Sequence, residues 1–320
     1  MKTTLKLKVI LSITALAVVL FGCSKDQVAP TAAREETSSL PTTADGKHVY
    51  GLLPTSQEEY SKYPVFSLSA FKPLHDEAVR VSSPIVTLSS PAVRDQGQIG
   101  SCTGFAGSEA YEITYFYKNG AYPAIVSPAY LYYEERVNIL GQKITADNGA
   151  NMVNIDQAIQ KYGITSEALM PYPSGDKTTA YKTSPTAAAI SYAAGYKISK
   201  YTLINSGDTA AVKTCLRNNI PVMFGFNVYD NTKTYAYFEG LSTTSYTYNP
   251  LTAAGGLAKG VSLLGGHANV IIGYNDTLKA FWVENSWSTS WGNKGYYYLP
   301  YSVFMSTKIV PQGGVYYMGI

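Results

Sequence analysis

Cysteine and histidine are scarce in this 320-residue chain, and their scarcity excludes several classes of function. There are three of each, and the six residues do not cluster at the spacings of metal ligands. The sequence contains no H-E-x-x-H, no CxxC pair, no G-x-S-x-G and no phosphate loop ending in Gly-Lys-Ser or Gly-Lys-Thr. Metal and nucleotide chemistry are therefore disfavoured, and we expect neither a metal nor a cofactor.

Long hydrophobic runs are missing too, apart from one near the amino terminus. Three lysines precede a 13-residue apolar run from Val9 to Phe21. A membrane-spanning helix needs about 20 residues, so this run is too short to cross a bilayer comfortably. We interpret residues 1–22 as a signal peptide.

The residues around the end of this run predict a lipid anchor. Gly22 stands directly before Cys23 and Leu20 three places before it, and polar residues follow. This arrangement resembles the lipobox of bacterial lipoproteins and predicts cleavage before Cys23 and lipidation of its thiol. An ordinary cleavage site with an incidental cysteine is the alternative.

Charge of either sign is sparse, because only 15% of the residues are charged. The formal charge of the chain is +3, and residues 1–22 hold three lysines and no acid, so the rest of the chain is neutral. A neutral protein has no basic field for nucleic acid, and we expect no such partner. The 28 tyrosines are compatible with a monomer that works outside the cytoplasm.

Two further segments lie between the predicted signal peptide and the regular part of the chain. Residues 23–46, rich in Ser, Thr, Ala and Pro, predict a disordered tether after Cys23, with a reach of roughly 25 to 30 Å. Residues 47–90 show scattered apolar positions without a strong period, so they are either a short pro-segment or an N-terminal elaboration. From residue 91 the pattern becomes regular.

The part from about 91 to 205 is predicted to be helical. Helices are expected over 102–119, from Ser127 to Gly141, and over 152–162, each with a cap or a terminating glycine. The part from about 206 to 320 is predicted to be mainly sheet, with apolar runs "PVMFGFNV", "HANVIIGY" and "AFWVEN". A helix around Cys215 opens this half, and its thiol is expected to be an inert core residue.

Cys102 is the cysteine with the environment of a nucleophile. It stands at the start of a predicted helix, where unpaired N–H groups and the helix dipole favour a thiolate. Gly97, Gly100 and Gly104 leave room for the backbone of a ligand. A small buried residue beside a glycine-rich turn is the alternative interpretation, although a free thiol is a liability in an exported protein.

His267 is the histidine best placed to act as the base. It opens the apolar strand "HANVIIGY", whereas His48 and His75 lie in irregular segments. The stretch to Asn285 predicts two strands around a turn near Asp276, with His267 and Asn285 opposite each other and within hydrogen-bonding reach. An asparagine there orients the imidazole, as in catalytic triads. The alternatives are a core histidine, an ordinary hairpin with a polar pair, or a register shifted by a bulge.

At this point three blocks in one order, "QGQIGSC", "GGHA" and "ENSWSTSWGNKGY", resemble the signature blocks of papain-like cysteine peptidases. The resemblance covers residues 91–320. It implies an α+β fold of two lobes, a helical lobe and a β-barrel-like lobe, with the active-site cleft between them. It also implies roles for individual residues: catalytic Cys102, His267 and Asn285, a resting thiolate–imidazolium pair, an oxyanion donor at Gln96, a shield at Trp287, and substrate contacts at Gly149, Ala150, Gly266 and Trp287.

The chain departs from that family at several positions. The family's usual cysteine three places before the nucleophile is Ile99 here, and the partner stretch reads Asp147, Asn148, Gly149 and Ala150. Loss of both halves of a disulfide leaves the rigidity of the groove in question, and Ala150 could crowd a bound peptide. Thr103 replaces a common tryptophan. No helical pro-region pattern precedes residue 91, so we do not expect latency by that route.

The resulting expectation is a cysteine endopeptidase that acts on proteins or peptides outside the cytoplasm, held by a lipid at Cys23 to a bacterial membrane. Which membrane face displays it, an outer membrane or the cell surface, stays open. Two other functions remain as alternatives. One is a catalytically silent lipoprotein that binds peptide or glycan in the same cleft, and the other is a thioester-forming transpeptidase or cell-wall amidase.

Overall fold

The computed structural model describes residues 40–72, 83–173 and 181–320. The chain divides into two units, Met1–Ser38 and Ser39–Ile320, and every described residue belongs to the second. Within the described ranges, no helix is both long enough and apolar enough to cross a membrane.

The predicted signal peptide, Cys23 and the tether up to residue 39 lie outside the described residues. The last part of the predicted tether, residues 40–46, is described and belongs to the folded unit. Thr42 forms an isolated antiparallel bridge with Val49, and Thr43 is buried. The packed part of the chain therefore extends further toward the amino terminus than composition indicated.

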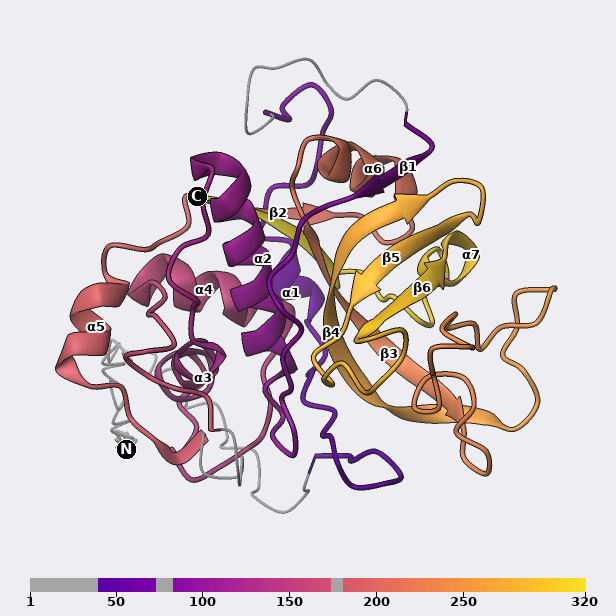
Figure 1. The fold of residues 1–320 in the computed structure, drawn as a ribbon, viewed down its shortest axis with the longest axis horizontal. Coiled ribbons are helices and arrows are strands. Elements are labelled where there is room, and N and C mark those ends of the chain that lie inside the picture. Colours follow the sequence, from indigo (N-terminus) through magenta and orange to yellow (C-terminus); the bar gives the residue numbers. More distant parts are fainter. Residues whose placement is uncertain (1–39, 73–82, 174–180) are drawn as a thin grey trace, which may run out of the picture. The chain divides into compact units, whose positions relative to one another are not determined.

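Helices and sheet separate into two sides, as the sequence predicted (Figure 1). Helices α2 to α5 lie together on one side of the sheet in this view, and α6 and α7 lie beside its strands. The bounds are α1 Gln57–Tyr60, α2 Cys102–Asn119, α3 Pro128–Tyr133, the π-helix η1 Glu134–Ile139, α4 Met152–Tyr162, α5 Ala187–Ala193, α6 Thr209–Arg217 and α7 Tyr301–Phe304.

Local signals set the ends of the predicted helices. Gly120 closes α2 in the left-handed conformation with φ of 76°, which a residue without Cβ adopts at little cost. Ser127 accepts a hydrogen bond from the amide of Tyr130 and so caps α3. Asn151 caps α4 in a capping box, and Gly163 ends it. The predicted helix after Ser127 continues as the π-helix η1 rather than as regular α-helix.

Helix α2 is more deeply buried than its apolar pattern indicated. The sequence predicted one apolar stripe, but every residue from Cys102 to Thr114 is buried. The reason is that α2 packs against α3 and α4 on one side and against strand β4 on the other. Buried acids on this helix need partners, and Arg94 pairs with Glu112 at 3.0 Å.

The sheet is antiparallel in every strand pair and has seven strands in the described part of the chain. Along it the order is β2-β7-β3-β4-β5-β6, and β1 also pairs with β4. The bounds are β1 Ile85–Thr87, β2 Lys200–Ile204, β3 Val222–Asn231, β4 Val261–Asn275, β5 Ala280–Glu284, β6 Tyr296–Pro300 and β7 Val315–Gly319. The central strand β4, which carries His267, is held by strands on both sides.

The register of β4 against β5 differs from the predicted one. Val270 pairs with Glu284, and a bulge lies between Ile271 and Gly273. Continued by one residue, this register places Asn269, rather than His267, opposite Asn285. The prediction of directly opposed His267 and Asn285 was therefore wrong, because the turn is centred between Thr277 and Leu278 rather than near Asp276, and the bulge compensates for only one residue of that difference.

Candidate active site

Cys102 is the first residue of α2 and is completely buried. Its N-cap, Ser101, makes no side-chain capping bond, so the first turn keeps donors available for another group. The thiol accepts hydrogen bonds from the backbone amides of Ala268, Gly51 and Thr103. Since Ala268 follows His267 directly, these bonds bring the helical side and strand β4 together at the sulfur.

His267 and Asn285 are in contact, as predicted. Nε2 of His267 lies 2.7 Å from Oδ1 of Asn285, and both side chains are buried. The same Oδ1 accepts the backbone amide of Ser286 at 2.8 Å. A backbone amide can only donate, so this atom of Asn285 must be the oxygen, and Nε2 must carry the imidazole proton.

The other ring nitrogen of His267 is therefore the basic one. Nδ1 is buried and has no hydrogen-bond partner among the described residues. The amide of the next residue, Ala268, donates to the thiol of Cys102, which places residue 267 beside the sulfur. An imidazole nitrogen with a free lone pair is the group needed to accept a thiol proton.

Gln96 lies beside the same group of residues. Its Nε2 donates to the carbonyl oxygens of Val49 and Ile99, each at 2.9 Å. Its Oε1 accepts a hydrogen bond from the hydroxyl of Ser286 at 2.7 Å. These three bonds fix the orientation of the amide, because a flipped amide would lose all of them. The predicted oxyanion donor is thus fixed in orientation, but its N–H groups are already engaged.

Trp287 covers the histidine side of the site. Its ring centroid lies 5.0 Å from that of His267, and the indole is buried. The ring of His48 stacks on the indole with a centroid distance of 4.6 Å. Trp287 therefore lies where the sequence placed a shield for the bond between His267 and Asn285.

The comparisons with known proteins agree with this geometry. The family model described as "Papain family cysteine protease" matches residues 86–310. The chain belongs to the papain family of cysteine proteases. The match begins slightly before residue 91 and includes part of β1, which the sequence had assigned to the N-terminal extension.

Individual papain-family relatives are distant. An uncharacterized peptidase C1-like protein of Acanthamoeba polyphaga mimivirus is 29% identical over 214 residues, covering 65% of this chain and 63% of that protein. Digestive cysteine proteinase 1 of Homarus americanus is 28% identical over 210 residues, covering 64% of this chain and 56% of that protein. The match thus spans less than two thirds of the length of either relative.

A solved structure covers more of the chain. The crystal structure of xylellain, a cysteine protease from Xylella fastidiosa, aligns with a TM-score of 0.67 at 25% identity and covers 84% of this chain and 95% of that chain. The predicted α+β fold with two papain-like lobes is confirmed.

In this papain-family chain, residues 47–54 run through the site between the helices and the sheet, and we call them the cleft strap. The amide of Leu52 donates to Gly266 at 3.1 Å, and the amide of Leu53 donates to Ala150 at 2.8 Å. Ala150 in turn donates to the carbonyl of Gly51 at 3.1 Å. Residues predicted to contact substrate, Ala150 and Gly266, therefore bind this strap through their backbones.

Glycines allow the cleft strap to lie this deep. A Cβ on Gly51 would stand 1.8 Å from the carbonyl oxygen of Gly100, and one on Gly149 would stand 2.1 Å from the oxygen of Gly51. A Cβ on Gly266 would stand 2.4 Å from the oxygen of Leu52. The glycine-rich segments do admit a close peptide backbone, and here that backbone belongs to the chain itself. Ala150 takes part through its backbone without crowding the strap.

The side chain of Leu52 marks an apolar pocket of the cleft. Its Cδ2 lies over Gly225, next to the side chain of Met152. A Cβ added at Gly225 would come within 2.7 Å of this Cδ2 and within 2.9 Å of Cγ of Met152. A cavity of about 270 Å³ surrounds this position, bordered also by Leu263 and Gly265.

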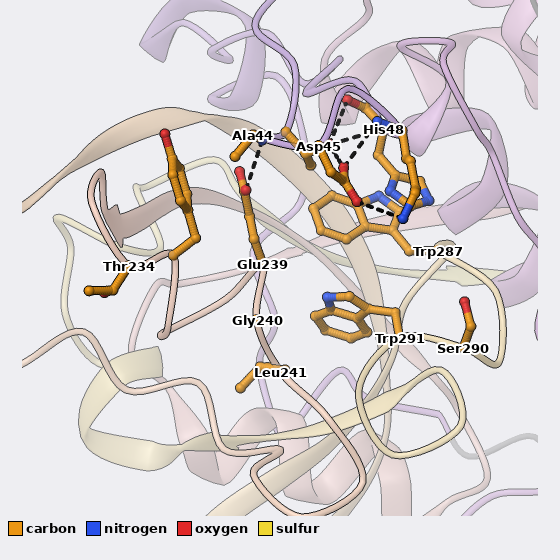
Figure 2. Close-up of a pocket in the computed structure, with 13 residues that line it drawn as sticks. Ala44, Asp45, His48, Thr234, Glu239, Gly240, Leu241, Trp287, Ser290 and Trp291 are labelled. Atoms are coloured by element: carbon orange, nitrogen blue, oxygen red, sulfur yellow. Dashed lines mark hydrogen bonds and ion pairs between the residues drawn. The ribbon is translucent and has the colours of Figure 1, made fainter.

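The other end of the cleft strap is held by Glu239, at the edge of a cavity of about 340 Å³ (Figure 2). One carboxylate oxygen accepts the hydroxyl of Tyr50 at 2.7 Å, and the other accepts the amide of Ala44 at 2.9 Å. Asp230 fixes the loop that carries Glu239, since its carboxylate accepts the amides of Tyr237, Phe238 and Glu239.

Burial under the cleft strap keeps both candidate catalytic groups neutral. Burial raises the pKa of the Cys102 thiol to about 12. Burial lowers the pKa of His267 to about 4, against the opposing effect of the hydrogen bond to Asn285. Burial in this covered form therefore opposes the thiolate–imidazolium pair implied by the family resemblance, because neither charge would have water around it.

The missing disulfide of the groove is replaced by other contacts. Ile99 packs with Tyr132 and Ala150 in a small buried cluster. Asp147, at the position of the absent partner cysteine, accepts the amide of Gly100 at 3.0 Å and the hydroxyl of Tyr132 at 2.5 Å. The two segments are thus joined without sulfur, and the described cysteines, Cys102 and Cys215, are both free.

Cys215 is a core residue, as expected. It lies on α6, is fully buried, and burial raises the pKa of its thiol. Among the described residues, no group of three or more His, Cys, Asp or Glu side chains could hold a metal ion. Sequence reasoning missed Gly51, Glu239 and Asn269, which have no distinctive local pattern and acquire their contacts only in the folded chain.

Proposed function

We propose that this protein is a cysteine endopeptidase that cleaves peptide bonds through a thioester. The observation that carries the proposal is the proton arrangement at His267, where Asn285 holds the proton on Nε2 and leaves Nδ1 without a partner in the described part of the chain, one residue before the Ala268 amide that contacts the thiol of Cys102. A protein that only binds peptides or glycans has no need of a buried base next to a thiol.

The chemistry follows from these positions once the cleft strap has moved. Nδ1 of His267 takes the proton of Cys102, and the thiolate sulfur forms a bond to the substrate carbonyl carbon. The oxyanion accepts hydrogen bonds from the side-chain N–H of Gln96 and the backbone N–H of Cys102. Breakage of the C–N bond delivers the proton from Nδ1 to the leaving amine, and water then hydrolyses the thioester with His267 as base.

The covered form is proposed to be latent, because the cleft strap is not presented as a substrate. The carbonyl that reaches Gln96 belongs to Val49, whereas the group of the strap that reaches the sulfur is the N–H of Gly51. An N–H facing Sγ offers no carbon to attack. Sequence reasoning did not expect a latency device of the family's helical type, and this strap is of a different, extended kind.

We further propose that Cys23 carries a lipid and holds a monomeric protein at a bacterial membrane outside the cytoplasm. The lipobox-like residues and the charge-poor composition support this proposal. Growth with a radiolabelled fatty acid tests it: the full chain should incorporate label and the Cys23→Ser variant should not. Equal labelling of the two would contradict the anchor.

The reaction class is tested with the full chain, purified in mild detergent, beside its Cys102→Ala variant. We expect the unmodified chain to cleave casein under reducing conditions once the cleft strap is displaced, and the variant to leave casein intact. Cleavage restricted to purified cell-wall peptides would indicate the amidase instead, and an amide product formed only with added amine would indicate transfer. Casein left untouched by both proteins, with the cleft open, would exclude the endopeptidase.

Displacement of the cleft strap is obtained with Gly51→Ala. The added Cβ would stand 1.8 Å from the backbone oxygen of Gly100, so the strap cannot keep its position. The matched control is Gly195→Ala, where the nearest atom outside the adjacent residues is 3.6 Å away. We expect iodoacetamide to alkylate Cys102 at least about tenfold faster in Gly51→Ala and at an unchanged rate in the control. Equal rates in all three proteins would contradict latency.

A further inference from the structure

A buried polar chain continues from the catalytic pair into the core. His267 and Asn269 are two residues apart on β4 and therefore share a face of the strand. Nδ2 of Asn269 donates to Oδ1 of Asn285 at 2.9 Å, and Oδ1 of Asn269 accepts the hydroxyl of Tyr297 at 3.0 Å. All four side chains are at most 2% exposed. Apolar residues of similar size would fill this space without the cost of burying polar groups.

The orientation of the Asn269 amide follows from its neighbours. Nδ2 also donates to the backbone oxygen of Ala268 at 2.9 Å, and a carbonyl can only accept, so this atom must be the nitrogen. Burial raises the pKa of Tyr297 far above its usual value, so its hydroxyl stays available as a donor to Oδ1. Backbone and phenol together hold Asn269 with its N–H groups toward Asn285.

The donors that reach its oxygen set the orientation of Asn285, and Asn269 supplies one of them beside the backbone amide of Ser286. Nδ2 of Asn285 is buried and has no hydrogen-bond partner among the described residues, so its amino group does nothing to set which way the amide faces. Its Oδ1 accepts three donors, from His267, Asn269 and the backbone of Ser286. A reversed amide would point its own N–H groups at these donors.

We propose that Asn269, held by Tyr297, is a positioning residue that locks Asn285 with its oxygen toward His267 and so keeps the imidazole proton on Nε2. The inference rests on the proposed function, since the tautomer matters because it leaves Nδ1 free to take the thiol proton. Nδ2 of Asn269 also lies 3.1 Å from Nε2 of His267, but its two hydrogens are directed at the oxygens of Ala268 and Asn285, so it does not donate to that nitrogen. Asn269 does not reach Nδ1, which has no partner within the described ranges, and Tyr297 acts one step further away. This series of hydrogen-bonded side chains thus extends from β4 to β6 behind the site.

The tautomer of His267 is the first measurement, because it does not need turnover. In full chain with ¹⁵N-labelled histidine, NMR shifts of the ring nitrogens report which one is protonated, and His267→Gln assigns the signal among the three histidines. We expect a single tautomer protonated on Nε2 in the unmodified chain. In Asn269→Val and in Tyr297→Phe we expect a mixture with the Nδ1-protonated form. An unchanged tautomer in both variants overturns the proposal.

Kinetics supply the second measurement, in the Gly51→Ala background that opens the cleft. We expect Asn269→Val to lower kcat about tenfold or more, the size of one strong hydrogen bond, with KM within about twofold. Tyr297→Phe should lower kcat by a smaller factor and should have no further effect once Asn269 is valine. An additive effect of Tyr297→Phe in the valine background would show that it acts by another route and would overturn the assignment.

Tyr248→Phe is the matched control for general packing damage. Tyr248 is fully buried, its ring lies 6.5 Å from that of Tyr297, and its hydroxyl bonds to the backbone of Tyr229 instead. It should change neither the tautomer nor kcat. An equal loss of kcat in this control would overturn the proposal. Absence of Cys102-dependent turnover in the Gly51→Ala parent would refute the endopeptidase, and the tautomer experiment would still decide the role of Asn269.

Discussion

At the scale of single residues, Gln96 has two roles with opposite consequences. It ties down the carbonyl of Val49 in the covered form and is proposed to hold the oxyanion during catalysis. We therefore expect Gln96→Ala to speed alkylation of Cys102, because the cleft strap loses a bond. In the Gly51→Ala background, the same change should lower kcat on casein by about 10²-fold, since one oxyanion donor is lost. Slower alkylation in Gln96→Ala would contradict the first role.

Glu135 controls how stability depends on pH. It accepts the hydroxyl of Thr103 at 2.5 Å, and burial raises its pKa from 4.5 to about 8. The folded protein binds more protons at this group than the unfolded chain, so its contribution to stability is present below pH 4.5 and is lost as pH rises toward 8. Glu135→Gln should raise Tm by about 3 °C or more at pH 9 and leave it unchanged near pH 4. Thermal melts at both values check this, and an equal shift at both would contradict it.

At the scale of elements, the cleft strap is attached to the sheet side through the backbone of Gly266 and through Glu239. Tyr50→Phe removes the 2.7 Å bond from the phenol to that carboxylate and leaves the ring packed against Trp287. We expect the strap to open about tenfold more often, because a hydrogen bond to a partly exposed carboxylate contributes about 1.4 kcal/mol. The rate of Cys102 alkylation measures this. Tyr133→Phe on α3 is the control, and a matching rate increase there would contradict a local effect.

The replacement for the missing disulfide is also an element-scale feature. Asp147 and the cluster of Ile99, Tyr132 and Ala150 join the segment before α2 to the segment before α4. The same segments supply Gly100 and Gly149, against which Gly51 lies. The groove is therefore held by one carboxylate and by apolar packing. Reducing conditions, which would break a disulfide, do not affect these contacts.

At the scale of the whole molecule, covering the cleft is coupled to pH through the two groups that it buries. The pKa of His267 is about 4 in the covered form, so the open form binds the extra proton more readily. Lowering the pH from about 6.5 toward 4 should therefore favour opening. The pKa of Cys102 is about 12 when covered, so raising the pH above about 8.5 should favour opening as well.

Hydrogen exchange at the amide of Leu52, corrected at each pH for its intrinsic rate, measures this opening. We expect a minimum between about pH 6.5 and 8.5, loss of the acidic rise in His267→Gln, and loss of the alkaline rise in Cys102→Ala. Glu239 opposes the acidic rise, because burial raises its pKa and the covered form holds its proton more tightly. His48, which belongs to the cleft strap, lies 3.3 Å from Asp95. An acidic rise that survives in His267→Gln would contradict the role of His267.

Much of the fold could be predicted because its signals are local. Gly120, Ser127, Asn151 and Gly163 end or begin helices where their own backbone chemistry requires it, and such effects act within a few residues. The contact between His267 and Asn285 was also predicted, since the two strands that carry these residues follow one another in sequence. The register between the strands was not, because the residues of the turn do not fix its centre, which lies between Thr277 and Leu278 rather than near Asp276.

The sequence by itself determined the succession of helices and strands, the papain-family blocks, and the candidate residues Gln96, Cys102, His267 and Asn285. Only the tertiary structure decided that residues 47–54 lie over them, that Asn269 and Tyr297 stand behind Asn285, and that thiol and imidazole are both buried. The reason is physical: capping and periodicity depend on close neighbours in the chain, whereas burial and protonation depend on groups that folding brings together from separate segments.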